Sequence, residues 1–349
     1  MKQNYHIRLS FFSKILSIDC LYSKERKRLI KCICINIVLL FTLFISCTDN
    51  ITDNGKRNTI FPITPVYFDN PVWHPTSNWI AALHSDSFDI NEDRINDAYF
   101  SGIWLINAET GQRKPFLHYQ PSSFSWSKYG NQLAMTLGGQ IYTIDIKNIS
   151  PIVIDTASLT QLTYESGYFP SFSPDGKWIV YDSRQDSPGQ NYIWKMRSDG
   201  SEKQCISNKG SGEWRMPNWA SDKNKIVYQR YVGVGGAEIF IMDSSGASQI
   251  RLTNDIIHDQ YPKFTKSGKT IGFLSSPLRE PRVIRLINSD GTNLRSVSPD
   301  WAYRFDFSPD GSKIVFVLWA PGSAATGNGQ LWLMNIDGSS LTQLTYFKP

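Results

Sequence analysis

A run of oxygen-bearing side chains over residues 89–97 has the spacing most typical of a chemical site in this sequence. Asp89, Asn91 and Asp93 stand at positions i, i+2 and i+4, as the first ligands of a calcium loop do. Arg94 occupies the place of the glycine that makes the sharp turn, and Phe100 that of the final bidentate glutamate. The spacing therefore favours a solvated acidic loop, with a Ca²⁺ site at Asp89, Asn91 and Asp93 as the alternative.

The residue types that usually perform catalysis are scattered along the chain. Beyond residue 46 there is no Gly-x-Ser-x-Gly elbow, no His-x-x-x-His or Cys-x-x-Cys pair and no phosphate-binding loop. Four histidines, His74, His84, His118 and His258, fall in different parts of the chain. We therefore expect no catalytic residues and a binding or scaffold module. The alternative is a glycosidase or lyase acting on carbohydrate, because two carboxylates or a histidine cluster can converge through tertiary structure alone.

Charge is concentrated at the N-terminus. Residues 1–46 hold 8 Lys+Arg and 2 Asp+Glu of the chain's 36 and 31, which leaves the remainder with a net charge of −1. A near-neutral body offers no electrostatic footprint for nucleic acid. Aromatic residues make up 13% of the chain and charged residues only 19%, which excludes intrinsic disorder of the bulk.

The N-terminus carries the pattern of an export signal. The basic segment 24–31 precedes an apolar run over 32–46 and then Cys47. Residues 44–47 (Phe-Ile-Ser-Cys) resemble a bacterial lipobox, in which the cysteine is acylated and becomes the first residue of the mature chain. We therefore predict a signal peptide over 1–46, a lipid anchor at Cys47 and a polar tether over 47–59. An uncleaved anchor is the alternative. Cys205 is the single cysteine after Cys47, so no disulfide framework is expected.

Six repeats occupy residues 60–349. Each contains an aromatic anchor followed by a polar turn, and the anchors are spaced 53, 46, 47, 45 and 43 residues apart. Four short β-type runs follow one another in each repeat, with no helical periodicity. This pattern predicts an all-β six-bladed β-propeller of four-stranded antiparallel blades. The anchors are Trp73, Trp126, Phe172, Trp219, Phe264 and Phe307.

The sharpest repeats, 172–181 (FSPDGKWIVY) and 307–316 (FSPDGSKIVF), resemble the WD40-like (PD40) repeats of TolB-like six-bladed propellers. The resemblance covers residues from about 60 to 346. It implies an interaction module in the bacterial envelope, periplasmic or facing the surface, with an envelope protein or glycan as partner. We expect a monomer. Either the segment around Ile63 and Thr64 or the strand ending at Leu344 and Thr345 closes the ring.

One face of the propeller is predicted to bind the partner. The turns after the first and third strands are tight, whereas the second-to-third loops carry long insertions, and irregular loops on a rigid scaffold concentrate binding residues. Residues just ahead of each inner strand should ring the channel mouth on that side, where aromatic, Arg and Gln side chains suit a polypeptide or sugar. These residues are Asp69, Tyr168, Trp214, Arg215, His258, Gln260, Tyr261, Trp301, Tyr303 and Arg304.

Overall fold

The computed structural model describes residues 50–51, 57–58, 67–88, 98–186, 189–207, 212–221, 224–233, 236–255, 257–276, 281–319 and 329–346. The chain divides into two compact units, Met1–Pro62 and Ile63–Pro349. In the first unit, β1 (Asn50–Ile51) pairs antiparallel with β2 (Arg57–Asn58). The predicted signal peptide, Cys47 and the calcium-loop residues Asp89, Asn91 and Asp93 lie outside the described residues. The described chain contains no helix long and apolar enough to span a membrane.

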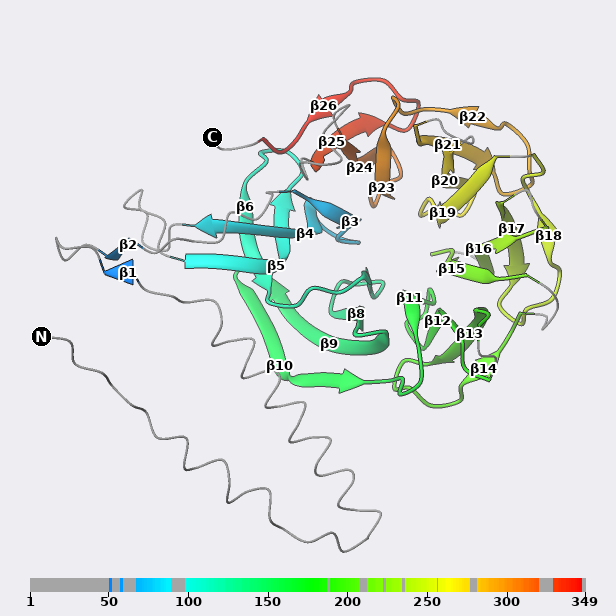
Figure 1. The fold of residues 1–349 in the computed structure, drawn as a ribbon, viewed down its shortest axis with the longest axis horizontal. Coiled ribbons are helices and arrows are strands. Elements are labelled where there is room, and N and C mark those ends of the chain that lie inside the picture. Colours follow the sequence, from blue (N-terminus) through cyan, green and yellow to red (C-terminus); the bar gives the residue numbers. More distant parts are fainter. Residues whose placement is uncertain are drawn as a thin grey trace, which may run out of the picture. The chain divides into compact units, whose positions relative to one another are not determined.

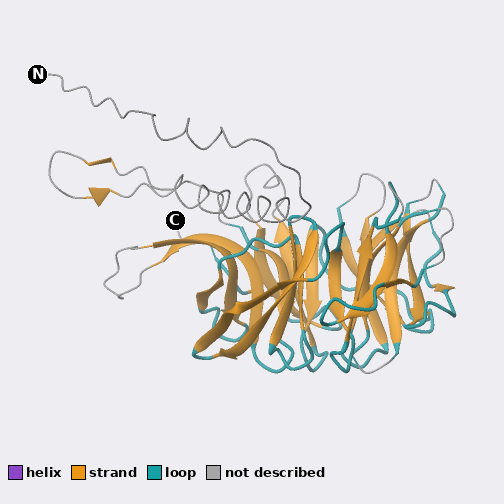
Figure 2. Cartoon of the chain, turned by 90° about the horizontal axis from the view of Figure 1, so that it is seen from below, coloured by secondary structure: helices purple, strands orange, loops and turns teal. Residues whose placement is uncertain are grey.

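The second unit consists of six four-stranded antiparallel sheets, each built from four consecutive strands. Figure 1 shows these sheets arranged as blades around a central axis, which confirms the predicted propeller. Figure 2 shows the connecting loops gathered at the two ends of the strands.

The strands of the first three blades are β3 (Asp69–Trp73), β4 (Trp79–Phe88), β5 (Ala98–Asn107), β6 (Arg113–Leu117), β7 (Ser123–Trp126), β8 (Gln132–Leu137), β9 (Gln140–Ile149), β10 (Ile152–Gln161), β11 (Tyr168–Phe172), β12 (Trp178–Ser183), β13 (Tyr192–Arg197) and β14 (Gln204–Cys205). Those of the last three are β15 (Trp214–Trp219), β16 (Lys225–Tyr231), β17 (Ala237–Asp243), β18 (Ile250–Arg251), β19 (His258–Phe264), β20 (Thr270–Ser276), β21 (Val283–Asn288), β22 (Arg295–Ser296), β23 (Ala302–Phe307), β24 (Lys313–Trp319), β25 (Gly329–Asn335) and β26 (Thr342–Gln343).

The Ser-Pro-Asp-Gly turn joins the first two strands of blade 3 by satisfying its own polar groups. Asp175 Oδ1 accepts hydrogen bonds from Ser173 Oγ (2.6 Å) and from the Lys177 N–H (3.0 Å). The Gly176 N–H donates to the Ser173 carbonyl at 2.9 Å, and Gly176 has φ +71°, which favours glycine. The Ser308–Ser312 turn of blade 6 repeats these bonds, so the repeat motif specifies this hairpin locally.

The hydrophobic core lies between neighbouring blades. Tyr181 and Trp194 of blade 3 share one buried cluster with Trp219 and Tyr228 of blade 4. Each sheet therefore packs a face against the next sheet, and large aromatic side chains fill the wedge between them. This packing explains why an aromatic anchor recurs in every repeat.

Blade 6 packs directly on blade 1 and so completes the ring. The Phe68 N–H donates to the Gly329 carbonyl at 2.9 Å, and the Trp73 N–H donates to Asp306 Oδ2 at 2.7 Å. The C-terminal strand belongs to blade 6, because the Leu344 N–H donates to the Leu331 carbonyl. Within the described residues, no strand is exchanged between the two blades. Closure there rests on side-chain packing and these hydrogen bonds.

Candidate functional site

The innermost strand of most blades contains a β-bulge near the axis. In five blades the residue three positions before the aromatic anchor has a positive φ between 36° and 55°. The strand register shifts at the same place. Residues other than glycine rarely adopt this backbone conformation, so the surrounding structure must stabilise it. The residues are Asn70, Phe169, Met216, Tyr261 and Arg304.

Side chains of the preceding blade hold three of these bulges. A bulge removes the backbone N–H from its own ladder, and a buried N–H needs another acceptor. The preceding blade supplies a hydroxyl, a carboxylate or an amide oxygen. The bonds are Phe169 N–H to Ser123 Oγ (3.1 Å), Met216 N–H to Asp182 Oδ2 (2.8 Å) and Tyr261 N–H to Gln229 Oε1 (3.1 Å).

Bulged side chains from different blades meet at the axis. The rings of Phe169 in blade 3 and Tyr261 in blade 5 contact edge to face, with centroids 6.0 Å apart. The Arg304 guanidinium of blade 6 lies 3.7 Å from the Tyr261 ring centroid, which is cation–π geometry. We call Phe169, Tyr261 and Arg304 the axial floor.

A cavity of about 250 Å³ lies between the axial floor and the turns that follow the innermost strands. All six blades line it. Its charged lining residues are four cations and one carboxylate, a formal net charge of +3. They are Lys128, Lys263, Lys266, Arg304 and Asp306.

Polar side chains in the cavity wall link successive blades. The Trp219 N–H donates to Ser171 Oγ at 3.0 Å, and the Phe264 N–H donates to Asn218 Oδ1 at 2.9 Å. Asp306 does the same for the Trp73 N–H and also forms a 3.0 Å ion pair with Lys263 Nζ. The wall therefore combines a structural role with exposed polar atoms that face the cavity.

A family model described as the TolB β-propeller domain (PD40) matches residues 96–300. The chain belongs to the TolB β-propeller family. This TolB-family chain is 31% identical over 134 residues to an uncharacterised protein of Agrobacterium fabrum. That match covers 38% of this chain and 43% of the relative, so the chain spans less than half of the relative's length.

Solved structures share the fold of this TolB-family propeller. TolB from Acinetobacter baumannii aligns with a TM-score of 0.56 at 18% identity, over 78% of this chain and 62% of that one. An oligogalacturonate lyase from Vibrio parahaemolyticus aligns with a TM-score of 0.51 at 12% identity, over 85% and 83% of the two chains. At these identities the likeness concerns architecture, and architecture alone does not specify function.

The TolB-family propeller brings two of the sequence-predicted mouth residues into the cavity, Tyr261 and Arg304. The others precede the bulges in the chain and are not among the residues that line the cavity. Burial raises the pKa of the Asp69 carboxyl, against the opposing effects of Arg304 and of the Asn70 N–H. Gln260 is buried, whereas Trp301 is 43% exposed.

Several predicted mouth residues have partners on the propeller itself. Trp214 is fully buried, with its ring centroid 5.1 Å from that of Tyr192. His258 Nδ1 accepts a hydrogen bond from the Ala237 N–H at 2.9 Å, and burial lowers the pKa of His258. The remaining three have polar or close neighbours: Arg215 Nε lies 3.9 Å from Glu213, Tyr303 lies edge to face with Trp319, and Tyr168 approaches Gly139.

Sequence reasoning missed the charged lining of the cavity in the TolB-family propeller. Part of the signal lay one position before the anchors, where five of the six repeats have a polar residue and the first has Val72. The five are Ser125, Ser171, Asn218, Lys263 and Asp306. A strand that is simply buried would place apolar residues there. Recurring polar residues beside an aromatic anchor indicate a strand that faces the axis.

The bulge at Met216 makes the stability of the TolB-family propeller depend on pH. Asp182 is fully buried, and burial raises its pKa to about 7 despite the Met216 hydrogen bond and nearby Arg215. Because the folded pKa lies above the ordinary value, the neutral form stabilises the fold, and this contribution is lost as pH rises from about 4 to 7.

We therefore expect the free energy of unfolding of Asp182→Asn, relative to that of the natural chain, to rise by about 2–4 kcal/mol from pH 4.5 to pH 7.5. The reason is that the amide stays neutral over this range and still offers an oxygen to the Met216 N–H. Urea unfolding at both pH values measures this difference. The comparison between the two proteins cancels the titration of the histidines. A constant difference across this range would contradict the assignment.

Proposed function

We propose that this chain is a lipid-anchored, non-catalytic propeller of the bacterial envelope that binds an acidic segment of an envelope protein in its axial cavity. Membership of the TolB family supports a binding or scaffold role. The proposed anchor is acylated Cys47, and the proposed location is periplasmic or surface-facing.

The charge of the cavity is the observation that carries the proposal. Lys128 and Lys266 are exposed residues on turns, whereas Lys263 and Arg304 are half-buried residues of the innermost strands, and all four line the cavity. Asp306 offsets one of these four charges through its ion pair with Lys263. Clefts lined by one sign of charge attract ligands of the opposite sign. The axial floor adds aromatic area against which a bound chain can pack.

Site-specific photocrosslinking in cells tests which face binds. We expect a photoreactive residue at Ser221, which lines the cavity, to capture a protein, and Lys128→Glu with Lys266→Glu to abolish that capture. Trp301, which is exposed and does not line the cavity, serves as the matched position. Capture only from Trp301, lost in Arg215→Ala with Tyr303→Ala, would instead support the mouth predicted from sequence. Capture of a glycan instead of a protein would show that the partner is a glycan. No capture from either position would refute the binding role.

The lipid anchor has its own test. We expect Cys47→Ala to move the protein from the membrane fraction to the soluble fraction, because acyl chains require the thiol. Cys205→Ala is the matched control, since Cys205 is half-buried in the propeller with its Sγ 3.6 Å from the Ser207 carbonyl. Unchanged partitioning of Cys47→Ala would refute the anchor.

The alternative function, cleavage of carbohydrate, needs two carboxylates or several histidines directed at one substrate. Among the described residues, the cavity lining contains a single carboxylate, Asp306, and no histidine. The donor set of this cavity therefore favours binding over cleavage.

A further inference from the structure

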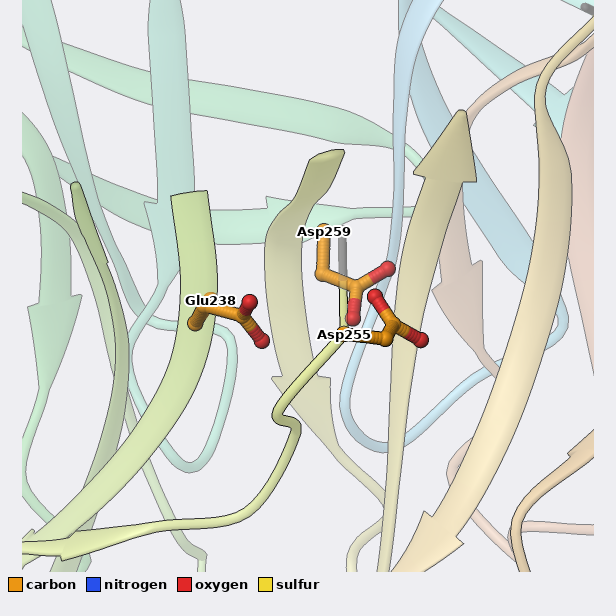
Figure 3. A group of neighbouring side chains, drawn as sticks. All are labelled: Glu238, Asp255 and Asp259. Carbon is orange, nitrogen blue, oxygen red and sulfur yellow. The ribbon is translucent and has the colours of Figure 1, made fainter. Parts of the chain in front are cut away.

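Three carboxylates meet at the interface between blades 4 and 5. Glu238 comes from β17, Asp259 from β19, and Asp255 from the connection between β18 and β19. One oxygen of each lies within 4.8 Å of an oxygen of the other two. Figure 3 shows the three carboxylates facing one another.

Asp259 brings an unpartnered oxygen into this group. Its residue is 0% exposed, and its Oδ1 accepts a 2.7 Å hydrogen bond from Ser275 Oγ. Its Oδ2 is buried and has no hydrogen-bond partner in the described part of the chain. Burial, together with Asp255 and Glu238, raises the pKa of Asp259 to about 7, against hydrogen bonds that lower it. A buried carboxylate oxygen without a donor requires a proton or a cation.

The other blades have no counterpart to Asp259. Asp259 stands five residues before the Phe264 anchor and pairs with Ser275 of the next strand. Trp214 and Ala302 stand five residues before the anchors of blades 4 and 6 and pair in the same way, with Arg230 and Leu318. Apolar residues or glycine occupy this position in all five other repeats. They are Phe68, Pro121, Gly167, Trp214 and Ala302. The fold therefore does not require a carboxylate at this position.

The fold does not require a carboxylate at position 238 either. Glu238 Oε2 accepts a 2.7 Å hydrogen bond from Thr253 Oγ1. A glutamine oxygen accepts the same bond in blades 2 and 6. Those pairs are Gln140 with Thr163 (3.0 Å) and Gln330 with Thr345 (2.9 Å). The negative charge of Glu238 is thus additional to its structural role.

Two arginines balance only part of the charge. Arg251 pairs with Glu238 at 2.9 Å, and Arg285 lies 3.7 Å from Asp255. Three carboxylates against two guanidinium groups leave a formal charge of −1. The Asp255 side chain is 34% exposed, so the group is open to solvent on that side.

We propose that Glu238, Asp255 and Asp259 form a Ca²⁺ site that joins blade 4 to blade 5. Ca²⁺ binds oxygen ligands at about 2.3–2.6 Å, so two ligands of one ion lie up to about 5 Å apart. Three carboxylate oxygens that lie within 4.8 Å of one another fit such a shell. Mg²⁺ usually keeps several waters and binds through one or two carboxylates, so a group of three carboxylates favours Ca²⁺. The site is separate from the axial cavity and does not depend on the proposed partner.

Thermal unfolding of the whole chain with EDTA and with CaCl₂ tests the site. At a hundredfold excess over Kd, we expect CaCl₂ to raise the melting temperature by about 4–8 °C at pH 7.5. The absence of any shift, or an equal shift with MgCl₂, would overturn the Ca²⁺ site.

Three variants assign the effect to these residues. Glu238→Gln keeps the acceptor for Thr253, as Gln140 and Gln330 do, and should lose the shift while remaining folded. Asp255→Asn changes a residue that is only half-buried and should also lose the shift, which keeps the test valid if the first variant misfolds. Asp89→Asn with Asp93→Asn should keep the shift. A shift that survives the first two variants, or disappears only in the third, would overturn the assignment.

Discussion

Replacing Trp214 with alanine is expected to lower the free energy of unfolding by about 3–5 kcal/mol, the range for truncating a fully buried tryptophan. The indole is 0% exposed and packs between blades 3 and 4. Its ring lies 5.1 Å from the Tyr192 ring and 4.4 Å from the Arg230 guanidinium carbon. Chemical denaturation measures the loss.

Trp214→Phe is the matched control. The phenyl ring of this variant retains most of the apolar contact. The substitution also removes the indole N–H, which has no hydrogen-bond partner among the described residues. We expect it to lose less than half as much stability as Trp214→Ala. If Trp214→Ala were as stable as the natural chain and yet failed to capture the partner, Trp214 would be a binding residue, as the sequence predicted.

Replacing Asp306 with alanine is expected to lower the free energy of unfolding by about 2–4 kcal/mol, because one substitution removes two partners. The Trp73 N–H loses its acceptor at the junction of blades 6 and 1, and Lys263 loses its 3.0 Å ion pair. The carboxylate is 18% exposed, so water replaces these bonds only in part. Denaturant titration provides the measurement.

Asp306→Asn separates the two contributions. The amide oxygen still accepts from the Trp73 N–H, whereas the ion pair with Lys263 is lost. We expect most of the stability to remain, since Trp73 is buried, whereas 25% of the Lys263 side chain is exposed to water. Equal losses in both variants would assign the effect to the ion pair, and no loss in either would mean that packing alone closes the ring.

The blade architecture could be predicted from the sequence because every blade repeats the same short sequence motif. The six aromatic anchors and the Ser-Pro-Asp-Gly turns predicted six four-stranded blades, and the structure confirms that count. In blade 3 the Ser173–Gly176 turn satisfies its hydrogen bonds within a few residues. Such short-range chemistry leaves its signature in consecutive residue types.

The bulges escaped prediction because the residues that adopt them give no local signal. Phe169 and Met216 have positive φ although neither residue type favours it. Their backbone N–H groups bond to Ser123 and Asp182, each more than 30 residues earlier in the chain. The hydrogen bonds from the neighbouring blade stabilise this conformation. The bulge in turn directs side chains towards the axis.

By itself, the sequence determined the blade count, the turns and the position of the core, because these follow from the periodicity of side chains along single strands. Tertiary structure decided which side chains meet: the axial floor, the basic cavity, and the union of Glu238 with Asp255 and Asp259. Closing the ring brings together residues of different blades that are far apart in the sequence. The spacing of residues along the chain does not determine the distances between them.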